Sequence, residues 1–202
     1  MMTAGRAARR LAAATALLIA CLPLAACEPA GVAVGDTQES APAVAHNEEP
    51  RVDVLVGIIG SPHPDASDAP DTRAIDALDR AGVNTVYVSV ADAQRPVDAV
   101  RQGISDMIDR RAYAIVVAGV DAGGDDADAW DGALRLARSA GIPVALIDPI
   151  TPPDDDTLYA AALHVDDHAA NATSLVKTLA DIINDRPHDR DIVVTTASGQ
   201  YR

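Results

Sequence analysis

Short apolar runs alternate with amphipathic stretches along most of the chain. The apolar runs, rich in Val, Ile, Leu and Ala, lie at 52–59, 85–90, 114–118, 143–147, 160–165 and 191–196. Runs that are apolar at successive positions are typical of strands buried on both faces of a parallel sheet. Between them, apolar residues recur at helical spacing over 72–81, 96–110, 126–140 and 168–184. The pattern therefore predicts a strand and a helix in regular alternation.

The spacing of these elements predicts the fold class. The strands begin roughly 30 residues apart, which is the size of a βαβ unit. Gly82 and Gly141 follow two of the expected helices, where a left-handed residue commonly ends a helix. Right-handed crossovers then give an α/β fold with a doubly wound parallel sheet. Ligands of such sheets bind at the carboxyl ends of the strands, so candidate site residues are sought there.

The first 27 residues have the pattern of an export signal. Three arginines precede an apolar run over 11–26, which is shorter than the about 20 apolar residues of a membrane span. The run ends at 24–27, Leu-Ala-Ala-Cys, which resembles a bacterial lipobox. We therefore expect lipidation of Cys27 and a lipid-anchored protein on the extracytoplasmic face of the cell membrane. Cys21 also fits the box, but cleavage there would leave an apolar stretch exposed.

Two further regions follow the leader. Residues 28–50 are rich in Pro, Ala, Glu, Gly and Ser without periodicity, and this composition predicts a disordered tether. Residues 51–202 carry the alternating pattern and form the expected folded lobe.

Composition narrows the function. The chain has 202 residues, a formal net charge of −14, 49% apolar residues and no Phe. A strongly acidic chain lacks the basic face that binds nucleic acid phosphates, so we expect no nucleic acid partner. Both cysteines lie in the leader, which excludes a disulfide framework in the folded lobe.

The ordered succession of strand-end segments resembles a known family. The segments at 90–96, 114–121, 140–148 and 165–171 are similar to the N-terminal lobe of type I periplasmic sugar-binding proteins. These are the ribose/xylose-type substrate-binding components of ABC importers. The resemblance implies a periplasmic-binding-protein-like lobe, a sugar or related polyol as ligand and an ABC permease as partner. It covers roughly 52–196, so we expect a single lobe, with the second lobe absent.

The resemblance also implies ligand-binding positions at the strand ends. Asp148 is the best match, as a carboxylate that would accept hydrogen bonds from sugar hydroxyls. The neighbouring candidates are Asp121, Asp92, Ser61 and Asp166.

Other chemistry is poorly supported. His164 and His168 straddle a strand end instead of sharing a helix face, which disfavours a zinc site. The aspartates between 121 and 131 miss the calcium-loop spacing, and the sequence contains neither a nucleophile elbow nor a P-loop. We therefore expect a binding protein and not an enzyme, with no catalytic residue, metal or cofactor.

Two functions remain open. The first is a lipid-anchored sugar-binding component of an ABC importer, truncated after its first lobe. The second is a one-lobe lipoprotein interaction module that docks on a permease or sensor without binding sugar.

Overall fold

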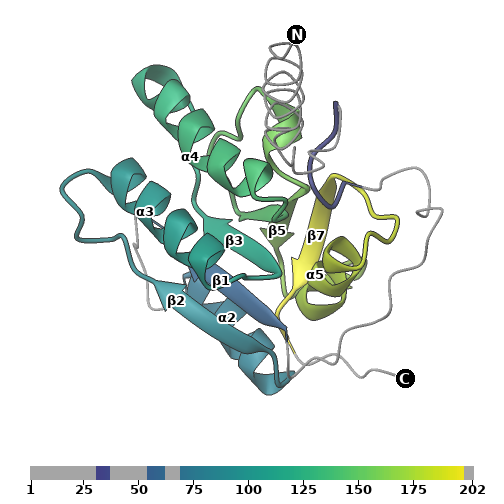
Figure 1. Cartoon of the computed structure of the whole chain (residues 1–202). Coiled ribbons are helices and arrows are strands. Elements are labelled where there is room, and N and C mark those ends of the chain that lie inside the picture. Colours follow the sequence, from purple (N-terminus) through teal and green to yellow (C-terminus); the bar gives the residue numbers. More distant parts are fainter. Residues whose placement is uncertain (1–30, 37–53, 62–68, 198–202) are drawn as a thin grey trace, which may run out of the picture.

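The computed structural model describes residues 31–36, 54–61 and 69–197 (Figure 1). The strands are β1 (Leu55–Ile59), β2 (Asn84–Val88), β3 (Ala114–Ala118), β4 (Val144–Ile147), β5 (Ala161–Val165), β6 (Thr173–Ser174) and β7 (Asp191–Thr195). The helices are α2 (Pro70–Arg80), α3 (Pro96–Asp109), α4 (Ala127–Ser139) and α5 (Leu175–Ile183). Among these described residues no helix is both long and apolar enough to cross a bilayer.

The strands form one seven-stranded sheet in the order β2-β1-β3-β4-β5-β7-β6. All six strand pairs are parallel, and Val56 of β1, for example, pairs with Ala114 of β3. This arrangement confirms the α/β fold with a doubly wound parallel sheet.

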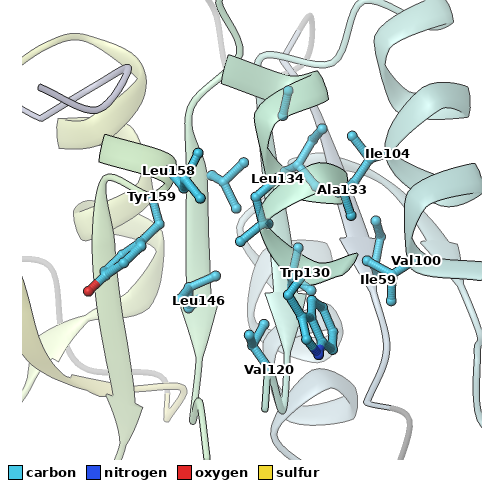
Figure 2. Packing of buried hydrophobic residues seen from close by; sticks show 14 of the residues in the cluster. Ile59, Val100, Ile104, Val120, Trp130, Ala133, Leu134, Leu146, Leu158 and Tyr159 are labelled. Atoms are coloured by element: carbon cyan, nitrogen blue, oxygen red, sulfur yellow. The ribbon is translucent and has the colours of Figure 1, made fainter. Parts of the chain in front are cut away.

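The sheet separates two apolar layers. One layer joins β1, β3 and β4 to helices α3 and α4, and Figure 2 shows part of it around Trp130 and Leu134 of α4. Helices α2 and α5 cover the other face through residues such as Leu78 and Leu179. Trp130 is only 2% exposed, so the single tryptophan belongs to the core and not to a binding surface.

The helices end in the same way, with a left-handed residue that reverses the chain. Gly82 and Gly141 have φ of 74° and 72°, which confirms the expected caps. Arg111 and Asp185 occupy the equivalent places after α3 and α5, with φ of 57° and 50°. The Arg111 N–H donates to the carbonyl of Ile108. The backbone of Arg111 thus has a left-handed conformation, which glycine would adopt without strain.

One predicted helix begins later than expected. The sequence pattern places it at 168–184, but α5 starts at Leu175. The carboxylate of Asp166 accepts hydrogen bonds from the N–H groups of His168 and Ala169, which holds the chain in a turn. Residues 173–174 then pair with β7 as strand β6. Local side-chain bonds and sheet pairing thus outcompete the helical pattern.

Residues 31–36, here called the strap, lie inside the expected tether and are packed against the domain. Ala33 of the strap is 2% exposed, and the carbonyl of Gly35 lies 2.8 Å from Nε2 of His188. Within this range the expectation of a structureless tether is wrong, because side chains of the domain bond to Val32, Gly35 and Asp36. The leader and the remainder of 28–50 lie outside the described residues, and the division of the chain at 27 and 50 stays a prediction.

The left-handed residue after α3 gives a stability prediction. Replacing Arg111, which is exposed, by Gly removes the conformational penalty of a Cβ at φ 57°. We expect Arg111→Gly to raise the free energy of unfolding by roughly 0.5–1 kcal/mol in urea denaturation. Gly82→Ala serves as the opposite control, with a loss of about 1 kcal/mol. An Arg111→Gly midpoint at or below that of the unaltered protein would contradict the assignment.

Candidate functional site

The carboxyl edge of the sheet contains a topological switch point between β1 and β3. These two strands are neighbours, although β2 lies between them in the sequence and pairs on the far side of β1. The chain therefore runs from β1 to β2 on one side of β1, and then from β2 to β3 on the other side of β1. Ligands of doubly wound sheets bind outside the strand ends at a switch point of this kind.

Ser61 and Gly119 meet at this switch point. Ser61 follows β1, and Gly119 follows β3 with a φ of 60°. A Cβ on Gly119 would lie 2.4 Å from Oγ of Ser61, so only glycine permits this approach. The Gly119 N–H donates to the carbonyl of Ile147 at 2.9 Å, which continues the pairing of β3 with β4. The predicted Ser61 therefore lies at the switch point, beside the end of β3.

Asp148 follows β4, the next strand along the edge. Its φ is 41°, a left-handed conformation that Asp adopts more readily than most residues. Its N–H donates to the carbonyl of Leu163 at 2.9 Å, and its Oδ1 accepts from the N–H of Val165 at 3.0 Å. Of the two carboxylate oxygens of Asp148, only Oδ1 has a hydrogen-bond partner among the described residues. The bond from Val165 thus holds the carboxylate in position at the strand end.

Asp121 lies beside the loop that carries Asp148. A parallel bridge joins Asp121 to Thr151, and the Ala122 N–H donates to the Thr151 carbonyl at 2.8 Å. Oδ1 of Asp121 accepts from the N–H of Gly123 at 3.3 Å. The loops after β3 and β4 are therefore bonded to each other, and Asp121 belongs to the same edge as Asp148.

The other two predicted residues do not join this group. Asp92 is exposed on a turn beyond β2, which the N–H of Ala93 closes on the carbonyl of Val90. Asp166 is exposed after β5, and its carboxylate caps its own turn at His168. The described contacts connect neither of them to Ser61, Asp121 or Asp148.

Asp167, which was not a predicted site residue, is the most heavily bonded carboxylate at the edge. Its Oδ1 accepts from Oγ1 of Thr195 at 2.8 Å and from the N–H groups of Thr196 and Ala197 at 2.6 and 3.1 Å. Its Oδ2 accepts from Oγ1 of Thr196 at 2.9 Å and lies 3.4 Å from Nη1 of Arg73. Asp167 thereby fastens the end of β7 and the start of α2 to β5.

These bonds lower the pKa of Asp167. Burial acts to raise it, but the hydrogen bonds from Thr195, Thr196 and Ala197 favour the charged form and bring the pKa to about 2, against an ordinary value of 3.8. Asp167 is therefore a structural carboxylate at neutral pH, and its lone pairs are already used by the protein.

A second unpredicted group lies at the β2 side of the switch point. The Tyr87 hydroxyl donates to Oδ2 of Asp71 at 2.8 Å, and Asp71 is 3% exposed. A Cβ on Gly60 would lie 2.3 Å from that hydroxyl, so the tyrosine abuts the residue before Ser61. Burial, followed by the hydrogen bond and charge of Asp71, raises the pKa of Tyr87. The residue as a whole is 46% exposed, and its hydroxyl lies beside the switch point.

Sequence signals for these residues are weak. Asp167 follows a strand, as do the better-matched Asp148 and Asp166, and nothing in its own neighbourhood marks its bonds to β7. Asp71 and Tyr87 come from a helix and a strand whose contact depends on the tertiary fold.

No family model matches the chain, and no curated protein matches its sequence. Among solved structures, one from Mycobacterium smegmatis in complex with β-D-fucofuranose is 23% identical over 56% of this chain and 35% of that chain, with a TM-score of 0.43.

Two further matches cover more of the chain. The periplasmic component of the arabinose ABC transporter of Shewanella, bound to L-arabinofuranose, is 15% identical over 71% of this chain and 56% of that one, with a TM-score of 0.43. A solute-binding protein of an ABC transporter from Bacillus halodurans, with bound myo-inositol, is 15% identical over 72% and 58%, with a TM-score of 0.44. The chain thus spans between 35% and 58% of the length of these three structures.

The low pKa of Asp167 predicts an acid dependence. Because the folded pKa lies below the ordinary 3.8, the carboxylate stabilises the fold above about pH 4, and this contribution is lost as the pH falls through about 2. After allowance for partial exposure, we expect Asp167→Asn to lower the free energy of unfolding by about 1–2 kcal/mol at pH 5.

The difference in free energy of unfolding between Asp167→Asn and the unaltered protein should shrink towards pH 2. Urea denaturation measured between pH 5 and pH 2 checks this. Asp154→Asn, an exposed aspartate, is the matched control and should change little. A stability difference for Asp167→Asn that is independent of pH would show that its charge is not what the fold uses.

Proposed function

We propose that this chain binds a sugar or related polyol at the carboxyl edge of its sheet, as the lipid-anchored solute-binding component of an ABC importer. The observation that carries the proposal is Asp148. Its backbone is held in a left-handed conformation at a strand end, one strand away from the switch point. Such strain persists where the surrounding structure enforces it, and it is concentrated at functional sites.

The chemistry of the edge suits a polyhydroxyl ligand. Oδ2 of Asp148 would accept a hydrogen bond from a sugar hydroxyl, while the Val165 N–H keeps the carboxylate in place. Ser61 at the switch point supplies a hydroxyl that can donate or accept. The Tyr87 ring, next to Gly60, would offer an apolar face to the ligand.

Anchoring and transport complete the proposal. The lipobox at 24–27 supports acylation of Cys27 and retention at the extracytoplasmic face of the membrane. An ABC permease is then the partner that receives the ligand. The order of the strand-end segments, similar to that of type I periplasmic sugar-binding proteins, supports this partner.

A second candidate function rests on Ile150. This residue is 61% exposed, and its N–H donates to the Val120 carbonyl at 2.7 Å, so the loop presents a large apolar side chain in a fixed position. Such a side chain would suit a partner protein that docks on the carboxyl edge. The chain would then be an interaction module, and sugars would leave its stability unchanged.

A sugar panel separates the two functions. We expect the melting temperature to rise by several degrees with one pentose, hexose or inositol, because a ligand at 100 times its Kd stabilises by about 2.7 kcal/mol. Asp148→Asn should weaken binding by about 10- to 100-fold through loss of a charge-assisted hydrogen bond. Asn tolerates the left-handed backbone and retains an oxygen for Val165, so the variant should fold.

Asp154→Asn again provides the control and should bind as the unaltered protein does. No response to any sugar would refute the binding proposal and favour the interaction module. Equal affinities of Asp148→Asn and the unaltered protein would place the ligand elsewhere.

A further inference from the structure

A cavity of about 510 Å³ lies at the amino edge of the sheet, where the strands begin. Tyr113 and Pro143 line this cavity, and they directly precede β3 and β4. Ser61 and Asp148 follow their strands, so the candidate sugar site belongs to the opposite, carboxyl edge. Cavities of roughly 300–1,000 Å³ are typical of small-molecule sites. This hollow, here called the amino-edge cavity, is therefore large enough for a second ligand.

The strap forms one wall of the amino-edge cavity. A Cβ on Gly35 would lie 2.9 Å from Cβ of Pro143, so glycine lets the strap approach the opposite wall this closely. The Gly35 carbonyl lies 2.8 Å from Nε2 of His188, and the Asp36 carboxylate forms an ion pair with Arg190. These bonds hold the strap against the domain, and the cavity is formed before any ligand enters it.

Apolar side chains make up much of the remaining wall. They come from the strap and from the ends of α3, α4 and α5: Val34, Ile108, Ile142, Pro143, Ile182 and Ile183. Tyr113, which is 39% exposed, adds an aromatic residue to this lining. Because the removal of apolar surface from water favours binding, a ligand of this cavity needs an apolar body.

Two charged residues of opposite sign also line the cavity, and both have a left-handed backbone. Arg111 follows α3 and Asp185 follows α5, with φ of 57° and 50°. Helices α2 and α4 end instead in Gly82 and Gly141, the residue type that adopts this conformation without strain. Left-handed side chains cost stability and are concentrated at functional sites. The two helix ends that carry a charged side chain in place of glycine thus border the same cavity.

The helix ends determine which charge each side of the cavity accepts. Three helices, α3, α4 and α5, end at its wall, and each carboxyl end carries the equivalent of about half a negative charge. Together with the Asp185 carboxylate, these ends favour a cationic group of a ligand. The guanidinium of Arg111, which is exposed, has five N–H donors in the geometry that matches a carboxylate.

We propose that the amino-edge cavity binds a short apolar peptide with free termini. The peptide carboxylate pairs with Arg111, its ammonium group pairs with Asp185, and its apolar side chains cover the isoleucines of the wall. A dipeptide matches a cavity of this volume, which is in the range of drug-sized ligands. This site is separate from the proposed sugar site and leaves the carboxyl edge open.

Calorimetric titration of the full chain tests this site, with the dipeptide leucylphenylalanine as the probe. Its carboxyl-terminal amide lacks the negative charge, and its N-acetyl form lacks the positive charge. We expect the unmodified dipeptide to bind, and each derivative to bind about 5- to 20-fold more weakly through loss of one charge-assisted hydrogen bond. Amide NMR signals of Gly35 and Gly141 should shift with the dipeptide.

Two variants assign the charges. Arg111→Gly should weaken binding of the dipeptide to the level of the amide derivative and leave the affinity for the amide unchanged. This variant is expected to be more stable than the unaltered protein, so weaker binding cannot result from unfolding. Asp185→Asn should act in the same way on the dipeptide and leave the affinity for the N-acetyl form unchanged, because Asn tolerates the left-handed backbone.

Arg101→Gln is the matched control, since Arg101 is an exposed arginine of α3 that does not line the cavity, and its affinities should equal those of the unaltered protein. Absence of dipeptide binding at millimolar concentration overturns the proposal. Equal affinities for the dipeptide and both derivatives, or an unchanged affinity in Arg111→Gly, overturn the recognition of the two termini. A sugar response at the carboxyl edge is measured separately and is unaffected by any of these outcomes.

Discussion

Burial of strand β3 on both faces is the constraint on which the rest of the structure depends. Every residue of Ala114–Ala118 is at most 1% exposed, so both sides of this strand need an apolar layer. Helices α3 and α4 supply one layer, and α2 and α5 supply the other. Since the centre of the sheet has no room for polar side chains, polar chemistry is confined to the strand ends.

The two edges of the sheet place their charged groups differently. At the carboxyl edge, Asp167 uses its charge to fasten β5, β7 and α2 together, while Asp148 keeps one oxygen outside the network of described bonds. At the amino edge, Arg138 and Arg190 donate to acceptors that include the strap. Arg138 and Arg190 thus lie at the opposite end of the strands from the candidate ligand carboxylate.

The sequence predicts the fold well where burial decides the structure. The β-branched run at 114–118 coincides with β3, and Gly82 and Gly141 mark the ends of α2 and α4 because a left-handed residue is needed there. The prediction is wrong where local polar bonds compete. Helix α5 starts later than predicted because Asp166 caps a turn, and helical periodicity does not reveal that turn.

The site was predictable only in part, for a related reason. Ser61, Asp121 and Asp148 follow neighbouring strands, and parallel pairing brings them to one edge. The partnership of Asp71 with Tyr87 has no sequence signature, because it depends on how α2 packs beside β2. The sequence did not predict that the strap packs on the domain, because its small residues are typical of disorder. The arginines that hold it lie far away in the sequence.

The most direct measurement of the central claim is a residue-resolved NMR titration of the ¹⁵N-labelled protein with the sugar or polyol that stabilises it. If the switch-point edge is the ligand site, the amide signals of Ser61, Gly119 and Val165 shift first and saturate together. Shifts confined to the amino edge, at residues such as Arg111 and Tyr113, would contradict this account.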